Sequence, residues 1–122
     1  METGLALTII GSVLSVVGVL FFLFPAAVNE KVMEELSESA IRPAAALRSV
    51  LGGSALMTGI LALCCRSFPQ DEASMLLTAY GVGMSVMLTS ILLIKPRKFT
   101  NEIPLPPVIM FVVLIGIAFY SA

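Results

Sequence analysis

The sequence predicts an all-α integral membrane protein: a four-helix bundle with a short interfacial amphipathic helix between the first and second spans. The first observation behind this is composition. Of the 122 residues, 58% are hydrophobic and 12% are charged, whereas a soluble domain is nearer half apolar and a quarter charged. The second is the gathering of apolar residues into four runs, which agrees with a mean hydropathy of +1.04. We therefore expect a single transmembrane domain over residues 1–122.

Each of the four runs is close to the roughly 20 residues that a helix needs to cross a bilayer. The expected spans are 5–24, 43–65, 73–94 and 104–121. Pro25 ends the first span, and Pro43 is expected in the first turn of the second, where proline is tolerated. The first run is too long for a signal-peptide core and follows the acidic Glu2, which favours a retained helix.

The basic residues predict an orientation. Six of the seven lie in or near the first and third loops: Lys31, Arg42, Arg48, Lys95, Arg97 and Lys98. Only Arg66 lies in the second loop. By the positive-inside rule the first and third loops are cytoplasmic. Both termini are then predicted on the non-cytoplasmic side, in a periplasm or lumen.

A short helix is expected over residues 29–39, with Asn29 as its cap and Glu30 in its first turn. Its apolar residues recur at helical spacing, which favours a position at the cytoplasmic interface. Its acidic residues form a candidate docking face: Glu30, Glu34, Glu35 and Glu38. One interpretation pairs this face with the basic third loop, 95–98; the other has it dock a partner protein.

Small residues recur inside the spans and predict close helix packing, since apolar burial does not drive helix association in lipid. The candidate packing residues are Gly11, Ser15, Gly18, Gly52, Gly53, Gly59, Ala79 and Gly83. Either these faces pack within the four-helix bundle, or some of them pack against another subunit.

Arg48 is the one charged residue inside the four spans. It lies five residues past Pro43, about 7.5 Å into the helix at the usual rise per residue. Three interpretations remain open for this candidate polar site. Arg48 reaches headgroups or helix-end carbonyls; it pairs with a carboxylate, Glu102 or Glu38; or it meets an acidic group of a ligand or a neighbouring subunit.

Several residue counts argue against classes of chemistry. The chain has no histidine and no tryptophan, and its two cysteines are the neighbours Cys64 and Cys65. Haem or zinc ligation by histidine and histidine acid–base catalysis are therefore excluded. We expect no metal site and no required cofactor, although lipid or pigment could bind between helices without leaving a sequence motif. The sequence has no basic cluster that would indicate binding to nucleic acid.

The stretch 46–59, ALRSVLGGSALMTG, resembles a pattern of small DoxX-like four-helix membrane proteins, many of them in a family of unknown function. An arginine opens the second helix, a glycine pair follows, and a further glycine comes later. The first helix ending at Phe24-Pro25 is similar too. The resemblance implies a four-helix bundle. The name-giving members are similar to subunits that accompany quinone-linked oxidoreductases. The resemblance implies no catalytic residue in this chain. Small multidrug exporters, membrane glutathione transferases and succinate dehydrogenase anchors fit worse, because their intramembrane charges or histidines are missing.

The main functional hypothesis is a non-catalytic membrane subunit or scaffold, not an enzyme, that packs against a larger complex, in a respiratory or photosynthetic setting. Its partners would be the lipid bilayer and other membrane subunits. The alternative is a small transporter or channel, as a homo-oligomer, with Arg48 at an anionic-ligand site. Hydroxyl groups that could line its polar path belong to Thr58, Thr78, Tyr80, Ser85 and Thr89.

Overall fold

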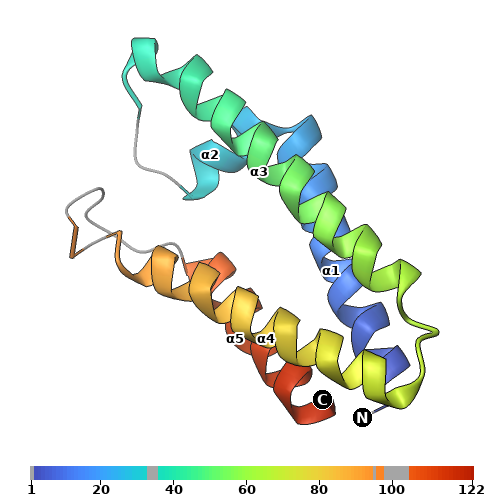
Figure 1. Ribbon diagram of the computed structural model, residues 1–122. Helices are drawn as coiled ribbons and strands as arrows, with labels where there is room; N and C mark the ends of the chain where they lie inside the picture. Colours follow the sequence, from blue (N-terminus) through green and yellow to red (C-terminus); the bar gives the residue numbers. More distant parts are fainter. Residues whose placement is uncertain (1, 33–35, 95, 98–104) are drawn as a thin grey trace. The chain divides into compact units, whose positions relative to one another are not determined.

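The computed structural model describes residues 2–32, 36–94, 96–97 and 105–122, and the regular structure within these ranges is entirely α-helical. The helices are α1 (Thr3–Leu23), α2 (Pro25–Val32), α3 (Glu38–Cys64), α4 (Gln70–Leu92) and α5 (Leu105–Ser121) (Figure 1). Three of them, α1, α3 and α4, are long and apolar enough to cross a membrane, and α5 is a shorter apolar helix. The prediction of an all-α fold with helices long and apolar enough to cross a membrane is confirmed for the described residues.

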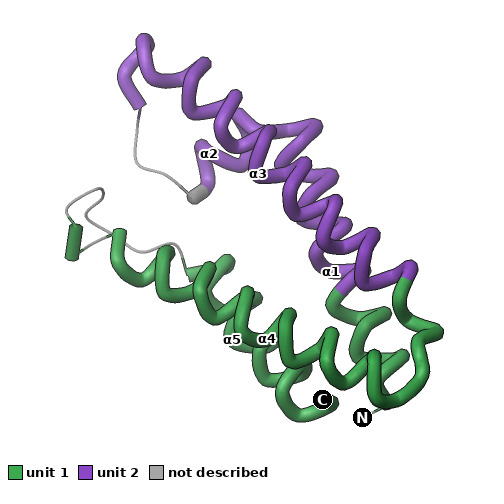
Figure 2. The backbone as a smooth tube through the Cα atoms, viewed as in Figure 1, with its two compact units in different colours: residues 1–10, 65–122 green, residues 11–64 purple. Residues whose placement is uncertain are grey.

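The chain divides into two compact units, which Figure 2 distinguishes by colour. One unit comprises residues 11–64 and therefore most of α1, all of α2 and all of α3. The other comprises residues 1–10 and 65–122, with the first residues of α1 and the helices α4 and α5.

Within the unit 11–64, glycines allow the backbones of α1 and α3 to touch. A Cβ atom added to Gly18 would lie 2.5 Å from the backbone nitrogen of Leu56. One added to Gly52 would lie 2.5 Å from the backbone nitrogen of Phe22, and one on Gly11 would lie 2.8 Å from the carbonyl oxygen of Gly59. At these contacts the residue number decreases along α3 as it increases along α1, so the two helices are antiparallel. Small residues are the ones that permit such an approach in lipid.

Helix α2 begins at Pro25, four residues before the helix start that the sequence predicted. Only Phe24 separates it from α1, and the Val28 amide donates to the Phe24 carbonyl at 3.1 Å. Proline suits a first helical position because its missing N–H needs no partner there. Asn29 is therefore an interior residue of α2 and not its cap. Helix α2 packs against α3.

The predicted helix 29–39 also ends differently, since Glu38 and Ser39 are the first two residues of α3. The Ala40 amide donates to the Ser37 carbonyl at 2.9 Å, so the chain turns into α3 at Ser37. Pro43 is then the sixth residue of α3 and lies beyond the first turn that the sequence predicted. It is exposed, and its ring nitrogen cannot donate to the Ser39 carbonyl, so α3 lacks one backbone bond near its start.

In the other unit, α4 begins directly after Pro69, and its first turn carries Asp71 and Glu72. Carboxylates there interact favourably with the positive end of the helix dipole. Helix α4 packs against α5, and Gly81 leaves room for the ring of Phe119. The first turn of α5 contains Pro106 and Pro107, where prolines remove no helix bond, and Pro104 lies outside the described residues.

The neighbouring glycines of α3 give a matched pair of variants. We expect Gly52→Ala to destabilise the protein by about 1–3 kcal/mol, because the added methyl meets the α1 backbone. A Cβ on Gly53 meets nothing within 4 Å. We therefore expect Gly53→Ala to leave stability unchanged or to raise it by up to about 1 kcal/mol through helix propensity. Unfolding titrations of the purified protein in detergent measure both, and equal effects would contradict the close approach.

Candidate functional site

The candidate site centres on Arg48 of α3, the one charged residue inside the predicted spans. Its Nε atom donates a hydrogen bond of 2.8 Å to Oδ1 of Asn29 in α2. Its guanidinium carbon lies 4.9 Å from the ring centroid of Phe21 in α1, a distance at which a cation is attracted to an aromatic face. All three residues belong to the unit 11–64, so three successive helices contribute to the cluster.

The local fold explains why these side chains meet. Arg48 lies about one turn before Gly52, where α1 and α3 touch, and Phe21 and Phe22 end α1 at the same contact. The Ser49 hydroxyl donates to the Phe22 carbonyl at 3.4 Å, a second link between the same ends. Because Pro25 restarts the helix at once, α2 stays close to α3. The sequence suggested neither Asn29 nor Phe21 as a partner of Arg48, and Pro25 is the one signal that could have placed them together.

The orientation of the Asn29 amide follows from its partner. The Nε atom of arginine is only a donor, so the amide atom facing it must be the oxygen. The amide nitrogen Nδ2 then points elsewhere, and it is buried without a hydrogen-bond partner. Asn29 itself is 4% exposed. A buried donor left unpaired costs about 1–3 kcal/mol, so this group calls for an acceptor.

The carboxylates predicted as partners of Arg48 do not pair with it in the described part of the chain. Glu38 is exposed and starts α3, ten residues before Arg48 and thus about 15 Å along the helix. Glu102 lies outside the described residues. Asn29 and Phe21 are the side chains that the described ranges place against Arg48, and both are uncharged.

The predicted acidic docking face is divided between two helices. Glu30 lies in α2 and Glu38 begins α3, and both are exposed. Glu34 and Glu35 lie outside the described residues. The four carboxylates therefore do not follow one continuous helix, because α2 ends at Val32.

The predicted packing residues fall into two groups. Five of them lie at the contact of α1 with α3: Gly11, Ser15, Gly18, Gly52 and Gly59. The others lie outside it. A Cβ on Gly53 or on Gly83 would meet nothing within 4 Å, and Ala79 is exposed.

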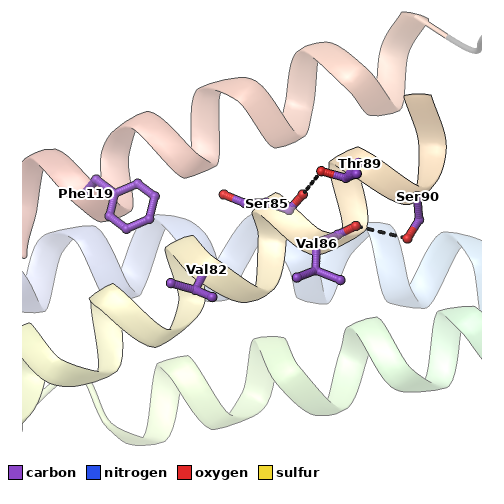
Figure 3. Close-up of a pocket in the computed structure, with 6 residues that line it drawn as sticks. All are labelled: Val82, Ser85, Val86, Thr89, Ser90 and Phe119. Carbon is purple, nitrogen blue, oxygen red and sulfur yellow. Dashed lines mark hydrogen bonds between the residues drawn. The ribbon is translucent and has the colours of Figure 1, made fainter. Parts of the chain in front are cut away.

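The hydroxyl groups predicted for a polar path largely bond to their own helices. Thr58, Thr78, Ser85 and Thr89 each donate to a backbone carbonyl three or four residues earlier, at 2.7–3.0 Å. Such back-bonding commits the O–H donor of each hydroxyl to its own helix, while the oxygen can still accept. An open groove of about 370 Å³ on α4 and α5 is also lined by hydroxyl groups that bond to their own helix (Figure 3). The hydroxyls of Thr89 and Ser90 in its wall turn back to α4, at 2.8 and 3.0 Å, and Val82, Val86 and Phe119 make it largely apolar.

The two cysteines are free thiols, Cys64 exposed and Cys65 buried. Within the described ranges, no group of three or more cysteine or carboxylate side chains is placed to hold a metal ion.

Comparison with known proteins found no matching family model, no matching curated protein and no matching solved structure. The resemblance to DoxX-like proteins therefore stays a prediction.

The contact between Arg48 and Asn29 can be measured by a double-mutant cycle. We expect Asn29→Leu to cost about 1–3 kcal/mol of stability, because it removes the acceptor of a half-buried cation. Combined with Arg48→Met, it should show a coupling of about 1 kcal/mol or more in unfolding titrations. Arg42→Met is the control on the same helix, since Arg42 is exposed, and its effect should add to that of Asn29→Leu. Additive effects of Asn29→Leu and Arg48→Met would contradict the contact.

Proposed function

We propose that the chain is a non-catalytic membrane subunit whose outward-facing glycines receive transmembrane helices of a larger membrane protein complex. The observation that carries this proposal is the open space at Gly53, Gly83 and Gly116, where an added Cβ would meet nothing within 4 Å. These glycines lie on three different helices, α3, α4 and α5.

Glycine inside a helix costs about 1 kcal/mol relative to alanine. Facing only lipid, it offers nothing in return. Facing another helix, it lets the two backbones approach closely. On α4 the exposed Ala79 precedes the exposed Gly83 by four residues, the spacing of a close helix contact. Uncovered glycines on three helices therefore favour contacts with other helices over contacts with lipid alone.

The side chains of the predicted transport path support a packing role as well. Four of its hydroxyl groups donate to their own backbone, which leaves them without a free O–H donor for a passing anion. The proposal therefore assigns no residue a catalytic or transport step.

The topology that we propose has four spans, with both termini on the non-cytoplasmic side. Helix α5 has 17 apolar-rich residues and a length of about 26 Å, slightly less than the roughly 30 Å hydrocarbon core. Local thinning of the bilayer accommodates so small a mismatch. Lys31 and Arg42, exposed at the link between α2 and α3, agree with a cytoplasmic position for that link.

Reporter fusions in a bacterial host test the topology. With four spans, alkaline phosphatase fused at either terminus should be active, since it folds only outside the cytoplasm, and a fusion within the loop 66–69 should be active as well. A three-span chain would place its termini on opposite sides, so activity at one terminus alone would contradict the proposal.

Copurification tests the proposed subunit role. After extraction in a mild detergent, the wild-type chain should migrate with a larger complex. Gly83→Leu should release it, because the added side chain keeps the partner backbone away. Val82→Leu is the control, since Val82 is exposed but points about 100° away around α4. The proposal would be contradicted if Gly83→Leu stayed in the complex, or if the wild-type chain were a monodisperse monomer. A complex that contains this chain alone would assign the face to a second copy.

A further inference from the structure

The guanidinium of Arg48 has unused hydrogen-bonding capacity. Its Nε donates to Asn29 and its plane lies near the ring of Phe21. The described residues provide no acceptor for its two terminal amino groups, which between them carry four N–H bonds. The side chain is thus held at one edge and against one aromatic ring, with its other edge left to bind something else.

The amide nitrogen of Asn29 is a second, independent sign of an incomplete site. It belongs to a side chain that is 4% exposed, and it has no hydrogen-bond partner. Its own oxygen contacts Arg48, so the orphan donor lies within one amide group of the guanidinium. Both unsatisfied groups are donors, so this part of the chain favours an acceptor as its ligand over a donor.

The charge balance specifies that acceptor further. The described part of the chain places no carboxylate against Arg48, and the nearest acidic residue in sequence on α2, Glu30, is exposed. A half-buried cation is costly unless an anion compensates it. The negative end of the α1 dipole, near Phe21, supplies only part of a charge. An external anion would supply the rest.

The depth of Arg48 favours phosphate. Helix α3 has 27 residues and a length of about 40 Å, which exceeds the roughly 30 Å hydrocarbon core and reaches the headgroup region. Arg48 follows the apolar start at Pro43 by about 7.5 Å, and its side chain leans toward the N-terminus of α3. Arginine binds phosphate oxygens in a fork of two parallel bonds.

We propose that Arg48 and Asn29 form a binding site for a phosphate group, carried either by a phospholipid headgroup or by a small soluble phosphate ester. Arg48 donates from its terminal amino groups to two phosphate oxygens. Asn29 holds the guanidinium in place through Oδ1, and its buried Nδ2 adds the partial positive charge of a further N–H dipole beside the guanidinium. This site does not depend on the partner helices proposed above.

Native mass spectrometry of the detergent-purified full chain tests the proposal. Three probes are compared: phosphatidylglycerol, diacylglycerol with the same acyl chains, and glycerol 3-phosphate. The wild-type chain should bind phosphatidylglycerol or glycerol 3-phosphate about tenfold or more tightly than diacylglycerol, because charge-assisted hydrogen bonds are lost without the phosphate. Preference for the phospholipid alone identifies a lipid site, and binding of both identifies a site open to soluble phosphate esters.

Variants separate a specific site from general attraction to positive charge. Arg48→Met should reduce phosphate binding about tenfold or more, and Arg48→Lys by less, since lysine keeps the charge but loses the fork. Asn29→Asp places a carboxylate beside the guanidinium, so it should abolish phosphate binding while the helical circular dichroism stays unchanged. Arg42→Met, on the same helix and exposed, should bind as the wild type does.

Three results would overturn the proposal. The first is a wild-type chain without preference for either phosphate probe over diacylglycerol, a comparison that needs no variant to fold. The second is binding that Arg48→Met or Asn29→Asp leaves intact. The third is an equal loss in Arg42→Met, which would reduce the effect to overall charge.

Discussion

The close approach of α1 and α3 is the constraint on which the described arrangement of residues 11–64 depends. Gly11, Gly18, Gly52 and Gly59 let two antiparallel backbones touch along almost two turns of each helix. In a bilayer the apolar side chains gain little by leaving lipid for protein, so dispersion contacts between well-fitted backbones have to hold the pair together. A methyl group added at any of these four glycines would overlap an atom of the other helix.

The same approach determines where the one charged residue of the second predicted span lies. Arg48 is one turn from Gly52, so the contact brings it to the end of α1, where Phe21 covers its cation. The immediate restart of the helix at Pro25 then brings Asn29 to its Nε atom. A neutral amide can share a hydrogen bond with arginine without cancelling its charge. The packing therefore stabilises the position of the guanidinium and preserves its ability to attract an anion.

Much of the fold could be predicted from composition and periodicity. A helix in lipid needs a long apolar run with few charges. The charged fraction of 12% and the four apolar runs meet this requirement, and both can be read from the sequence alone. Arg48 could be identified in the same way, because a charge inside an apolar run is costly and rare. Its partner could not. The sequence left open headgroups or helix-end carbonyls, a carboxylate (Glu102 or Glu38), and a ligand or neighbouring subunit. The described residues place Asn29 against Arg48, a residue that the helical pattern had assigned to a cap.

The sequence by itself determined the all-α class, the approximate positions of the apolar helices and the one charged residue, Arg48, within them. All three features depend only on the order of charged, proline and apolar residues along the chain, because each apolar run has to be long enough to cross the hydrocarbon core. Only the tertiary structure decided which glycines lie at the contact of α1 with α3, because neighbours such as Gly52 and Gly53 differ only by rotation around α3. It also decided the partner of Arg48, since that contact joins residues 19 positions apart and needs α2 to fold against α3.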